Sequence, residues 1–375
     1  MPMKAETKIT VNGLISLGFL LIPAITIFLF SLFSMQVEEH YALVWYPAIS
    51  NTLRTITKYL PFSMGDILGL LIIISLIVNL FRWVWEGISN KFTVHFIGAG
   101  VLHLVKTLLW IYIIFNLIWG LNYSRMGIAY QLNLEPEPYQ KLSVTQVTNE
   151  LMDSLNSCRR QIKDTALPIQ EFNAISKEAY KRYQSVSMSY PFLNYRNRSV
   201  KQSMFSGMGD FIGFTGYFNP FTGEAQVRSD IPRVMVPFIA CHEMAHQLGY
   251  ASESEASFVG YLAASTSKDP YFKYSLYLEL FSYAQSEELL LYSKEKDLKG
   301  FDSLIKFNRS YLDTLVKKDR KEIRQFFLKR KNNISPAFNS LYDQYLKLNK
   351  QSGGIQSYDD VLGWLIAYRK RVGKI

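Results

Sequence analysis

The sequence is poor in charged residues and in cysteine for its length. Charged side chains make up 19% of the 375 residues, whereas an average soluble protein carries about a quarter. This deficit excludes an intrinsically disordered chain and argues against an ordinary cytosolic globule. Two cysteines, Cys158 and Cys241, cannot build a disulfide framework or a cysteine metal cluster, and the sequence leaves open whether they pair with each other.

Acidic residues are outnumbered by basic ones, which leaves a formal net charge of +10. Such a balance is compatible with nucleic acid, anionic lipid or acidic substrates. The excess lies mainly in the second half, in helical-looking stretches such as residues 317–331, and no nucleic-acid-binding motif surrounds it. We therefore predict no nucleic-acid partner, and we interpret the charge as solvated helix faces or a face turned towards anionic lipid.

Apolar residues gather in three long stretches in the first third of the chain. No charged side chain occurs between Ile9 and Val37, and a spanning helix needs about 20 residues. We predict transmembrane helices at about 12–35, 65–86 and 100–121, so that residues 1–121 form a membrane domain in the lipid bilayer. The alternative, buried helices of a soluble domain, applies best to the second and third stretches, whose uncharged cores are shorter.

The positive charges that flank these stretches predict their orientation. The N-terminus and the loop between the second and third stretches carry Lys4, Lys8, Arg82, Lys91 and Lys106. The loop between the first two stretches has Arg54 and Lys58, offset by Glu38 and Glu39. This bias predicts a multi-pass protein of the inner (cytoplasmic) membrane, with a cytoplasmic N-terminus and with residues 122–375 on the periplasmic or extracellular side.

Residues 122–375 have the pattern of one water-soluble domain of the α+β class, mainly α-helical with a small antiparallel hairpin. Strands Phe211–Phe218 and Glu224–Arg228 are predicted to flank a turn at Asn219–Gly223. A helix from Pro237 to Leu248 follows, and Gly249 ends it. Further helices are predicted at Thr145–Ile162, Ile169–Tyr183, Ser254–Ala264, Tyr271–Tyr292, Gly300–Val316, Arg320–Lys331, Pro336–Asn349 and Tyr358–Arg371.

The predicted helix before Gly249 contains the motif HExxH, from His242 to His246. Residues four apart lie on one face of a helix, so both imidazoles can bind one ion. Zinc suits imidazole nitrogens, and we predict one Zn²⁺ per chain. Glu243 lies one residue further round the helix, where it can act as the general base on a metal-bound water.

The motif is more specific here than its three fixed residues suggest. By typical residue frequencies, HExxH occurs by chance about once in a hundred chains of this length. However, His242 and His246 are the only histidines in residues 122–375, and their neighbours Phe238, Ile239 and Leu248 are apolar, as a buried active-site helix requires. A chance pattern on a core helix is therefore the weaker interpretation.

A third protein ligand is needed, and no third histidine follows. Glutamate-type zinc peptidases carry this ligand on the helix after HExxH, often as the first Glu of an E-x-E-A stretch, which is Glu253 here. Glu255 is the rival. The alternative for Glu255 is a capping box with Ser252, and the alternative for Glu253 is a solvated charge favoured by the helix dipole.

Two further functions are predicted around the motif. The hairpin could present an edge strand on which a peptide lies by strand addition, although it could equally be only structural. A transition-state donor is also expected, and in the absence of another histidine the candidates are Tyr217, Tyr250 and Tyr358.

Several motifs along the chain together resemble one family. They are Leu60–Asp66, Trp119–Tyr123, Asn219–Ala225, His242–Gly249, Glu253–Phe258, Tyr345–Lys347 and Ser357–Tyr358. In these the sequence is similar to the bacterial domain-of-unknown-function family 3810, whose members look like membrane-anchored zincin-type peptidases. The departures are Leu248, where Arg is common, and Ser257, where Asn is common. The resemblance implies a zincin-like domain behind three spans and supplies no substrate.

These observations lead to one expected function and two alternatives. We expect a membrane-anchored zinc metallopeptidase that hydrolyses peptide bonds of a protein or peptide substrate near the membrane. The first alternative is a non-enzymatic membrane assembly or signalling protein with a structural or vestigial metal site. The intact Glu243 argues against it, because a structural site needs no base. The second alternative is a zinc hydrolase of a non-peptide amide.

Overall fold

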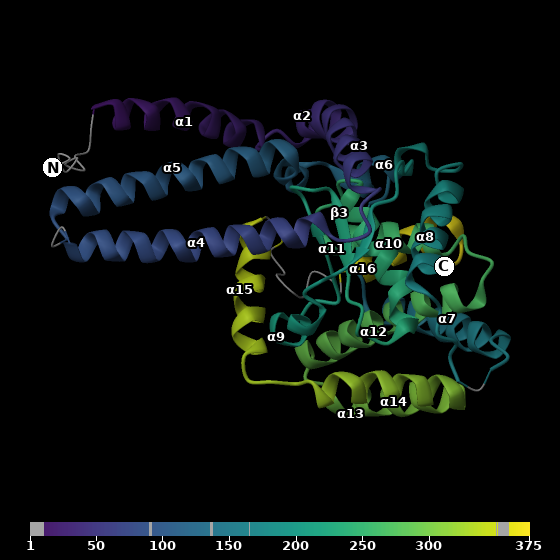
Figure 1. The fold of residues 1–375 in the computed structure, drawn as a ribbon. Coiled ribbons are helices and arrows are strands. Elements are labelled where there is room, and N and C mark those ends of the chain that lie inside the picture. Colours follow the sequence, from purple (N-terminus) through teal and green to yellow (C-terminus); the bar gives the residue numbers. More distant parts are fainter. Residues whose placement is uncertain (1–10, 90–91, 136–137, 165, 350, 352–359) are drawn as a thin grey trace.

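A stem of three long helices projects from one side of a larger, mainly helical domain (Figure 1). The computed structural model describes residues 11–89, 92–135, 138–164, 166–349, 351 and 360–375. The stem consists of α1 (Val11–Phe30), α4 (Met64–Ser89) and α5 (Val94–Ile118). All three are long and apolar enough to cross a membrane. The third begins at Val94 rather than near residue 100, because Thr93 accepts the backbone hydrogen bond that caps it there.

The stem exposes its apolar side chains instead of burying them. Phe81 on α4 is 72% exposed, and no residue of the most apolar 18-residue segment of α4 is buried within the protein. A surface of this size and kind would be costly in water and is favourable in hydrocarbon. The stem therefore associates the protein with a membrane.

The segment between α1 and α4, which the sequence analysis treated as a loop, is helical. It consists of α2 (Ser34–Gln36), the π-helix η1 (Val37–Trp45) and α3 (Tyr46–Thr57). It packs on the domain: the hydroxyls of Tyr46 and Ser50 donate to the carbonyl of Gln247 at 3.0 and 2.6 Å. The predicted membrane part and the predicted catalytic domain thus share an interface.

The remaining helices form the body of the domain. In chain order they are η2 (Gly120–Ser124), α6 (Gly127–Leu132), α7 (Lys141–Gln161), α8 (Phe172–Val186), η3 (Pro191–Leu193), η4 (Ser206–Met208), α9 (Gly209–Ile212), η5 (Arg233–Met235), α10 (Val236–Gln247), α11 (Glu253–Ala264), α12 (Pro270–Lys294), α13 (Leu298–Tyr311), α14 (Thr314–Lys329), α15 (Ser335–Leu348) and α16 (Val361–Val372).

A three-stranded sheet precedes α10. Its order is β1 (Val200–Gln202), β3 (Glu224–Val227), β2 (Gly216–Asn219). The predicted antiparallel hairpin is confirmed, with Tyr217 opposite Gln226. Two details of the prediction are wrong. Residues from Phe211 onward begin in α9, so β2 starts only at Gly216, and β1, which pairs parallel to β3, was missed because three residues carry too little pattern.

Helix α10 lies at the centre of the domain, and every one of its residues is buried. Helix α11 packs against it so closely that a Cβ on Gly260 would lie 3.3 Å from the backbone nitrogen of His242. The two cysteines are buried free thiols, which answers the question of pairing.

Two neighbouring helix boundaries are predicted wrongly in the C-terminal half, the end of the helix from Gly300 and the start of the helix predicted from Arg320. Instead of running from Gly300 to Val316, the chain breaks after Tyr311 and restarts at Thr314. The break is a tertiary effect: Leu312 is buried, and the backbone N–H of Asp313 donates to the side chain of Asn156 on α7 at 2.9 Å.

The contact between η1 and the domain rests on a buried ion pair. The carboxylate of Glu38 is fully buried and accepts from both Nε and Nη2 of Arg125, at 2.9 and 2.7 Å. It also accepts from the backbone of Gly127 and the side chain of Gln131.

We predict that Glu38→Ala lowers the free energy of unfolding by about 3–5 kcal/mol, because it leaves the Arg125 guanidinium buried without its counter-ion. Thermal unfolding of the detergent-solubilised protein measures this loss. The control is Glu39→Ala, since Glu39 is exposed. Equal stability of the two variants would contradict the prediction.

Candidate metal and catalytic site

Helices α10 and α11 bring three of the predicted site residues together. His242 and His246 lie one turn apart on α10, and Glu253 is the first residue of α11. Nε2 of His242 is 3.2 Å from Nε2 of His246, and Oε2 of Glu253 is 3.1 and 3.3 Å from these two nitrogens. Ligand atoms on a tetrahedral zinc ion, with bonds of 2.0–2.1 Å, lie about 3.3 Å apart. The donor set therefore fits a zinc ion in type and in spacing.

The outer nitrogens of both imidazoles are held by other groups. Nδ1 of His246 lies 2.7 Å from the carbonyl oxygen of Tyr250. Because a carbonyl only accepts, this Nδ1 carries the hydrogen of the neutral ring, and Nε2 presents a lone pair to the carboxylate of Glu253. Nδ1 of His242 lies 3.1 Å from the hydroxyl of Ser257. A lone pair and a carboxylate in contact call for a cation between them.

The turn between the two helices depends on Gly249. Its φ is +91°, and a Cβ there would lie 2.7 Å from the ring of Tyr46 and 2.9 Å from the side chain of Asn122. Only glycine meets both conditions without strain. This turn returns the chain to the histidines and so positions Glu253.

The structure separates the two candidates for the third ligand. Glu253 faces the histidines, while its Oε1 accepts from the hydroxyl of Tyr342 at 2.9 Å. Glu255 points elsewhere, since its Oε1 accepts from the backbone of Ile128 at 2.7 Å. The capping-box interpretation of Glu255 is also wrong, because the side chain of Ser252 makes no cap hydrogen bond.

Burial and mutual charge set the protonation of the group. Burial alone raises the pKa of Glu253, but His246 and His242 together hold it well below its usual range. Burial lowers the pKa of His242. Burial also opposes the charge on His246, yet Glu253 outweighs it and raises the pKa of His246 to about 9. Without a metal ion, one proton on His246 thus compensates the carboxylate.

Glu243 lies beside this group and faces a pocket. Burial raises its pKa to about 8, against the lowering effect of His246. Its Oε2 is buried and has no hydrogen-bond partner in the part of the chain that the structure describes. Strand β2 passes so close that a Cβ on Gly216 would lie 2.6 Å from Oε1 of Glu243.

The pocket has a volume of about 490 Å³, and Gly216 and Tyr217 of β2 are among the residues that line it. His242 and Glu243 form part of its wall, and aromatic rings from several elements form much of the rest. The other residues that line it include Phe214, Gly216, Tyr217, Phe238, Glu279, Tyr283, Asn339 and Tyr342. The metal-facing residues are therefore buried, and His242 and Glu243 adjoin a pocket that several elements enclose.

The three predicted tyrosines have different positions. Tyr217 lines the pocket, but its hydroxyl is already bonded to Asp66 and to Ser203. The hydroxyl of Tyr250 donates to Gln131, away from the pocket, and only its carbonyl serves the site. The geometry thus argues against Tyr250 as a donor to substrate. Tyr358 lies outside the described residues.

Several residues that surround the site were not predicted from the sequence. Tyr342 bonds Glu253 from α15, and the side chain of Gln351 accepts from the backbone N–H of Glu253 at 3.1 Å. The indole of Trp119 donates to the carbonyl of His246 at 3.3 Å. Each lies far from the motif in sequence, so no local spacing could have indicated it.

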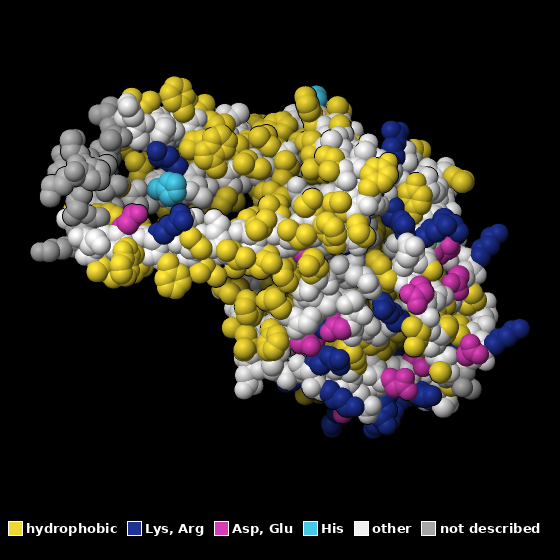
Figure 2. Space-filling view, in the orientation of Figure 1, with side chains coloured by type: hydrophobic (Ala, Val, Ile, Leu, Met, Phe, Trp, Pro, Cys, Tyr) yellow, Lys and Arg dark blue, Asp and Glu magenta, His cyan; other side chains and the backbone are white. Residues whose placement is uncertain are grey.

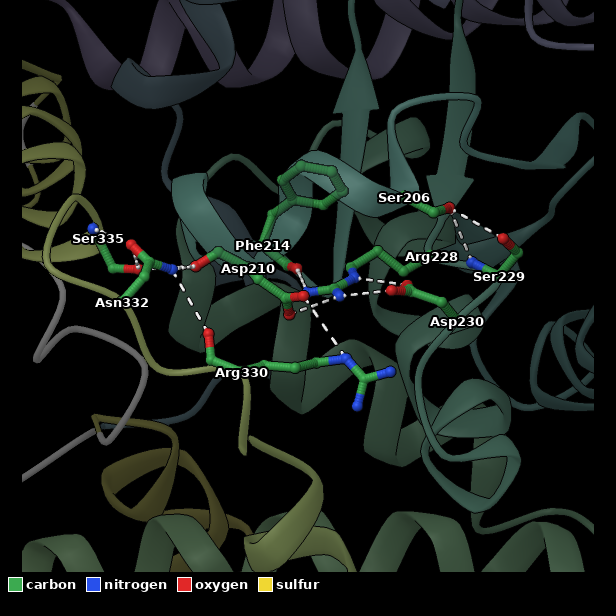
Figure 3. A network of polar contacts seen from close by, with 9 residues as sticks. All are labelled: Ser206, Asp210, Phe214, Arg228, Ser229, Asp230, Arg330, Asn332 and Ser335. Carbon is green, nitrogen blue, oxygen red and sulfur yellow. Dashed lines mark hydrogen bonds and ion pairs between the residues drawn. The ribbon is translucent and has the colours of Figure 1, made fainter. Parts of the chain in front are cut away.

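A polar network lies next to the pocket and includes the backbone of the pocket-lining residue Phe214 (Figure 3). Arg228 donates to Asp210 and to Asp230 at 2.8 and 2.9 Å. The backbone carbonyl of Asp210 in turn accepts from Asn332 and from Ser335, each at 2.6 Å. The network fixes the start of α15 to the segment that precedes β2.

Comparison with known families agrees with the motifs. The family described as "Protein of unknown function (DUF3810)" matches residues 41–366. The chain belongs to this family. No curated protein and no solved structure matches the chain. For this DUF3810 member, the function must therefore be argued from the site.

We predict that the purified protein binds one zinc ion per chain and that Glu253→Ala loses it, because two imidazoles alone form an incomplete site. Elemental analysis after zinc loading and desalting measures the metal. The control is Glu255→Gln, which keeps an acceptor for Ile128 and should keep the metal. Metal loss in Glu255→Gln and retention in Glu253→Ala would reverse the assignment.

We also predict that zinc binding releases protons near neutral pH. His246, with its pKa raised to about 9, and Glu243, with its pKa raised to about 8, are protonated at pH 7 in the metal-free site and must lose these protons when a cation enters. Calorimetric titration in two buffers of different ionisation enthalpy should show between one and two protons released per ion at about pH 7, and fewer as the pH approaches about 10. Release that does not change with pH would contradict this.

Proposed function

We propose that this DUF3810 member is a membrane-anchored, zinc-dependent metallopeptidase with a zincin-like domain. The observation that carries the proposal is the combination of two features at one place. Three ligand atoms lie 3.1 to 3.3 Å apart, and a carboxylate with one unpartnered buried oxygen adjoins them at the wall of a pocket.

The donor set supports zinc over other common ions. Two imidazoles and one carboxylate are the ligands of catalytic zinc in several peptidases, whereas calcium and magnesium prefer oxygen alone. His242, His246 and Glu253 would hold the ion. Bound there, zinc would polarise a carbonyl and acidify a water molecule.

Glu243 is proposed as the general base. Its free Oε2 is the atom that would take a proton from the attacking water and pass it to the leaving amine. The raised pKa of this carboxyl keeps it close to the operating range of such a proton carrier. Nearby positive charge would keep it ionised before it accepts the proton.

Strand β2 supports a peptide substrate. It is an edge strand of the sheet, and two of its residues, Gly216 and Tyr217, line the pocket. An extended peptide could add to this edge through backbone hydrogen bonds and thereby bring one amide towards Glu243. Tyr217 and Tyr342 line the pocket, and either would serve as a transition-state donor by exchanging the hydrogen bond that it now donates, to Asp66 or to Glu253, for one to the substrate.

A structural metal site is less well supported. Structural zinc is usually closed by four protein ligands. Among the described residues, the group that could hold an ion contains His242, His246 and Glu253 alone.

We propose that the site works on the non-cytoplasmic side, on proteins or peptides near the membrane.

We predict that Glu243→Gln lowers peptide hydrolysis by about 10²–10⁴-fold while zinc binding persists, because the amide cannot accept the proton. The assay incubates the detergent-solubilised protein with a proteome-derived peptide mixture and identifies new termini by mass spectrometry. Glu255→Gln, a buried carboxylate that does not face the histidines, is the matched control. Cleavage by Glu243→Gln at the wild-type rate would exclude the mechanism, and zinc bound without any cleavage would favour a non-peptide amide or a structural role.

A further inference from the structure

Helix α15 carries an apolar stripe that no described part of the chain covers. Leu341 is 62% exposed and Leu348 is 85% exposed. The stripe recurs every three or four residues, which is the spacing of one helix face. Its members are Ile334, just before the helix, and Phe338, Leu341, Tyr345 and Leu348.

The other faces of α15 are polar or contact the domain. Asp343 and Lys347 form an ion pair of 2.7 Å. Leu346 is fully buried, while Asn339 and Tyr342 line the pocket. The helix is therefore amphipathic: its apolar stripe lies on a different face from Leu346 and the pocket-lining residues, and Leu341 and Leu348 on this stripe are the most exposed.

The stripe lies where the stem joins the domain. The hydroxyl of Tyr345 is 3.3 Å from that of Tyr123, which belongs to η2 directly after α5. In Figure 1, α15 runs across the direction of the stem, on the side of the domain from which the stem projects. In Figure 2, hydrophobic side chains continue from the stem onto the adjoining edge of the domain. The stripe is thus continuous with the surface that is apolar enough to enter a bilayer.

Helix α15 is fixed at its start to α9 and, through its middle and the residue Gln351 after its end, to the candidate site. At its start, Ser335 and Asn332 donate to the backbone of Asp210 (Figure 3). After its end, Gln351 bonds the backbone of both Leu346 and Glu253. In its middle, the hydroxyl of Tyr342 donates to the metal-facing carboxylate of Glu253. A change in the position of α15 therefore moves Tyr342, which lines the pocket and bonds Glu253.

We propose that α15 is an interfacial helix whose stripe rests in the headgroup region of the same bilayer that holds the stem. The membrane thereby sets the position of Asn339 and Tyr342, the residues of α15 that line the pocket. Helices of this kind bury their apolar face about 5–10 Å into the interface. A second copy of the chain is a weaker occupant, since the stripe continues the lipid-facing surface of the stem. This placement rests on the proposed function and implies that the substrates are proteins or peptides whose cleaved segment lies against the membrane surface.

The test measures the depth of single nitroxide labels on the full chain in phosphatidylethanolamine–phosphatidylglycerol vesicles. Leu341→Cys and Leu348→Cys place labels on the stripe, and Lys347→Cys places one on the polar face as the matched control. All three positions are exposed, so the fold tolerates the label, and the buried native cysteines are checked with unsubstituted protein.

We expect the ratio of collision rates with oxygen and with a water-soluble nickel chelate to be at least about threefold higher at residues 341 and 348 than at 347. Equal ratios at the three positions would overturn the proposal. Spin–spin broadening at 341 that disappears on dilution with unlabelled protein would also overturn it, by assigning the stripe to a second copy. These measurements require neither metal nor cleavage, so their failure is distinct from failure of the proposed function.

Discussion

The structure depends on the burial of two imidazoles and a carboxylate in contact at the centre of the domain. Their facing atoms lie within 3.3 Å of one another. In a medium of low polarity, such a group is stable only with a cation at its centre, a proton or a metal ion. The hydrogen bond that Nδ1 of His246 donates to the carbonyl of Tyr250, and the one between Nδ1 of His242 and the hydroxyl of Ser257, then fix which ring atoms face inward. The same arrangement requires α11 to approach α10 closely at Gly260 and the chain to turn back sharply at Gly249, because both bring Glu253 to the two histidines.

The membrane-proximal segments complete the helix that carries this group. The last carbonyls of an α-helix have no partner within the helix. In α10 they are the carbonyls of His246 and Gln247, which accept from Tyr46, Ser50 and Trp119. Two of these donors lie between the first two spans and one directly after the third. The segments beside the stem and the candidate site are therefore one structure, and the site does not form independently of the residues that flank the stem helices.

The pocket links the same helix to the C-terminal part of the chain. Its strand side comes from β2, while its outer wall includes Asn339 and Tyr342 of α15. Arg228 bonds both Asp210 and the backbone of the pocket-lining Phe214, and the carbonyl of Asp210 accepts from the residues at the start of α15. An apolar stripe on α15 turned towards the bilayer would make the membrane itself a boundary of the site. This arrangement suits a protein that acts on substrates presented at the surface of the bilayer.

The sequence by itself determined the features that rest on local spacing. Residues four apart meet on a helix, so His242 and His246 could be paired without a structure, and the three apolar stretches were apparent from composition. The features that depend on distant partners were decided only by the tertiary structure. Glu253 and Glu255 both occupy the first turn of α11, and the choice between them rests on the backbone of Ile128. Tyr342 bonds Glu253 across the fold. Such contacts leave no periodic signal, because the energy that selects them arises only when separate helices pack together.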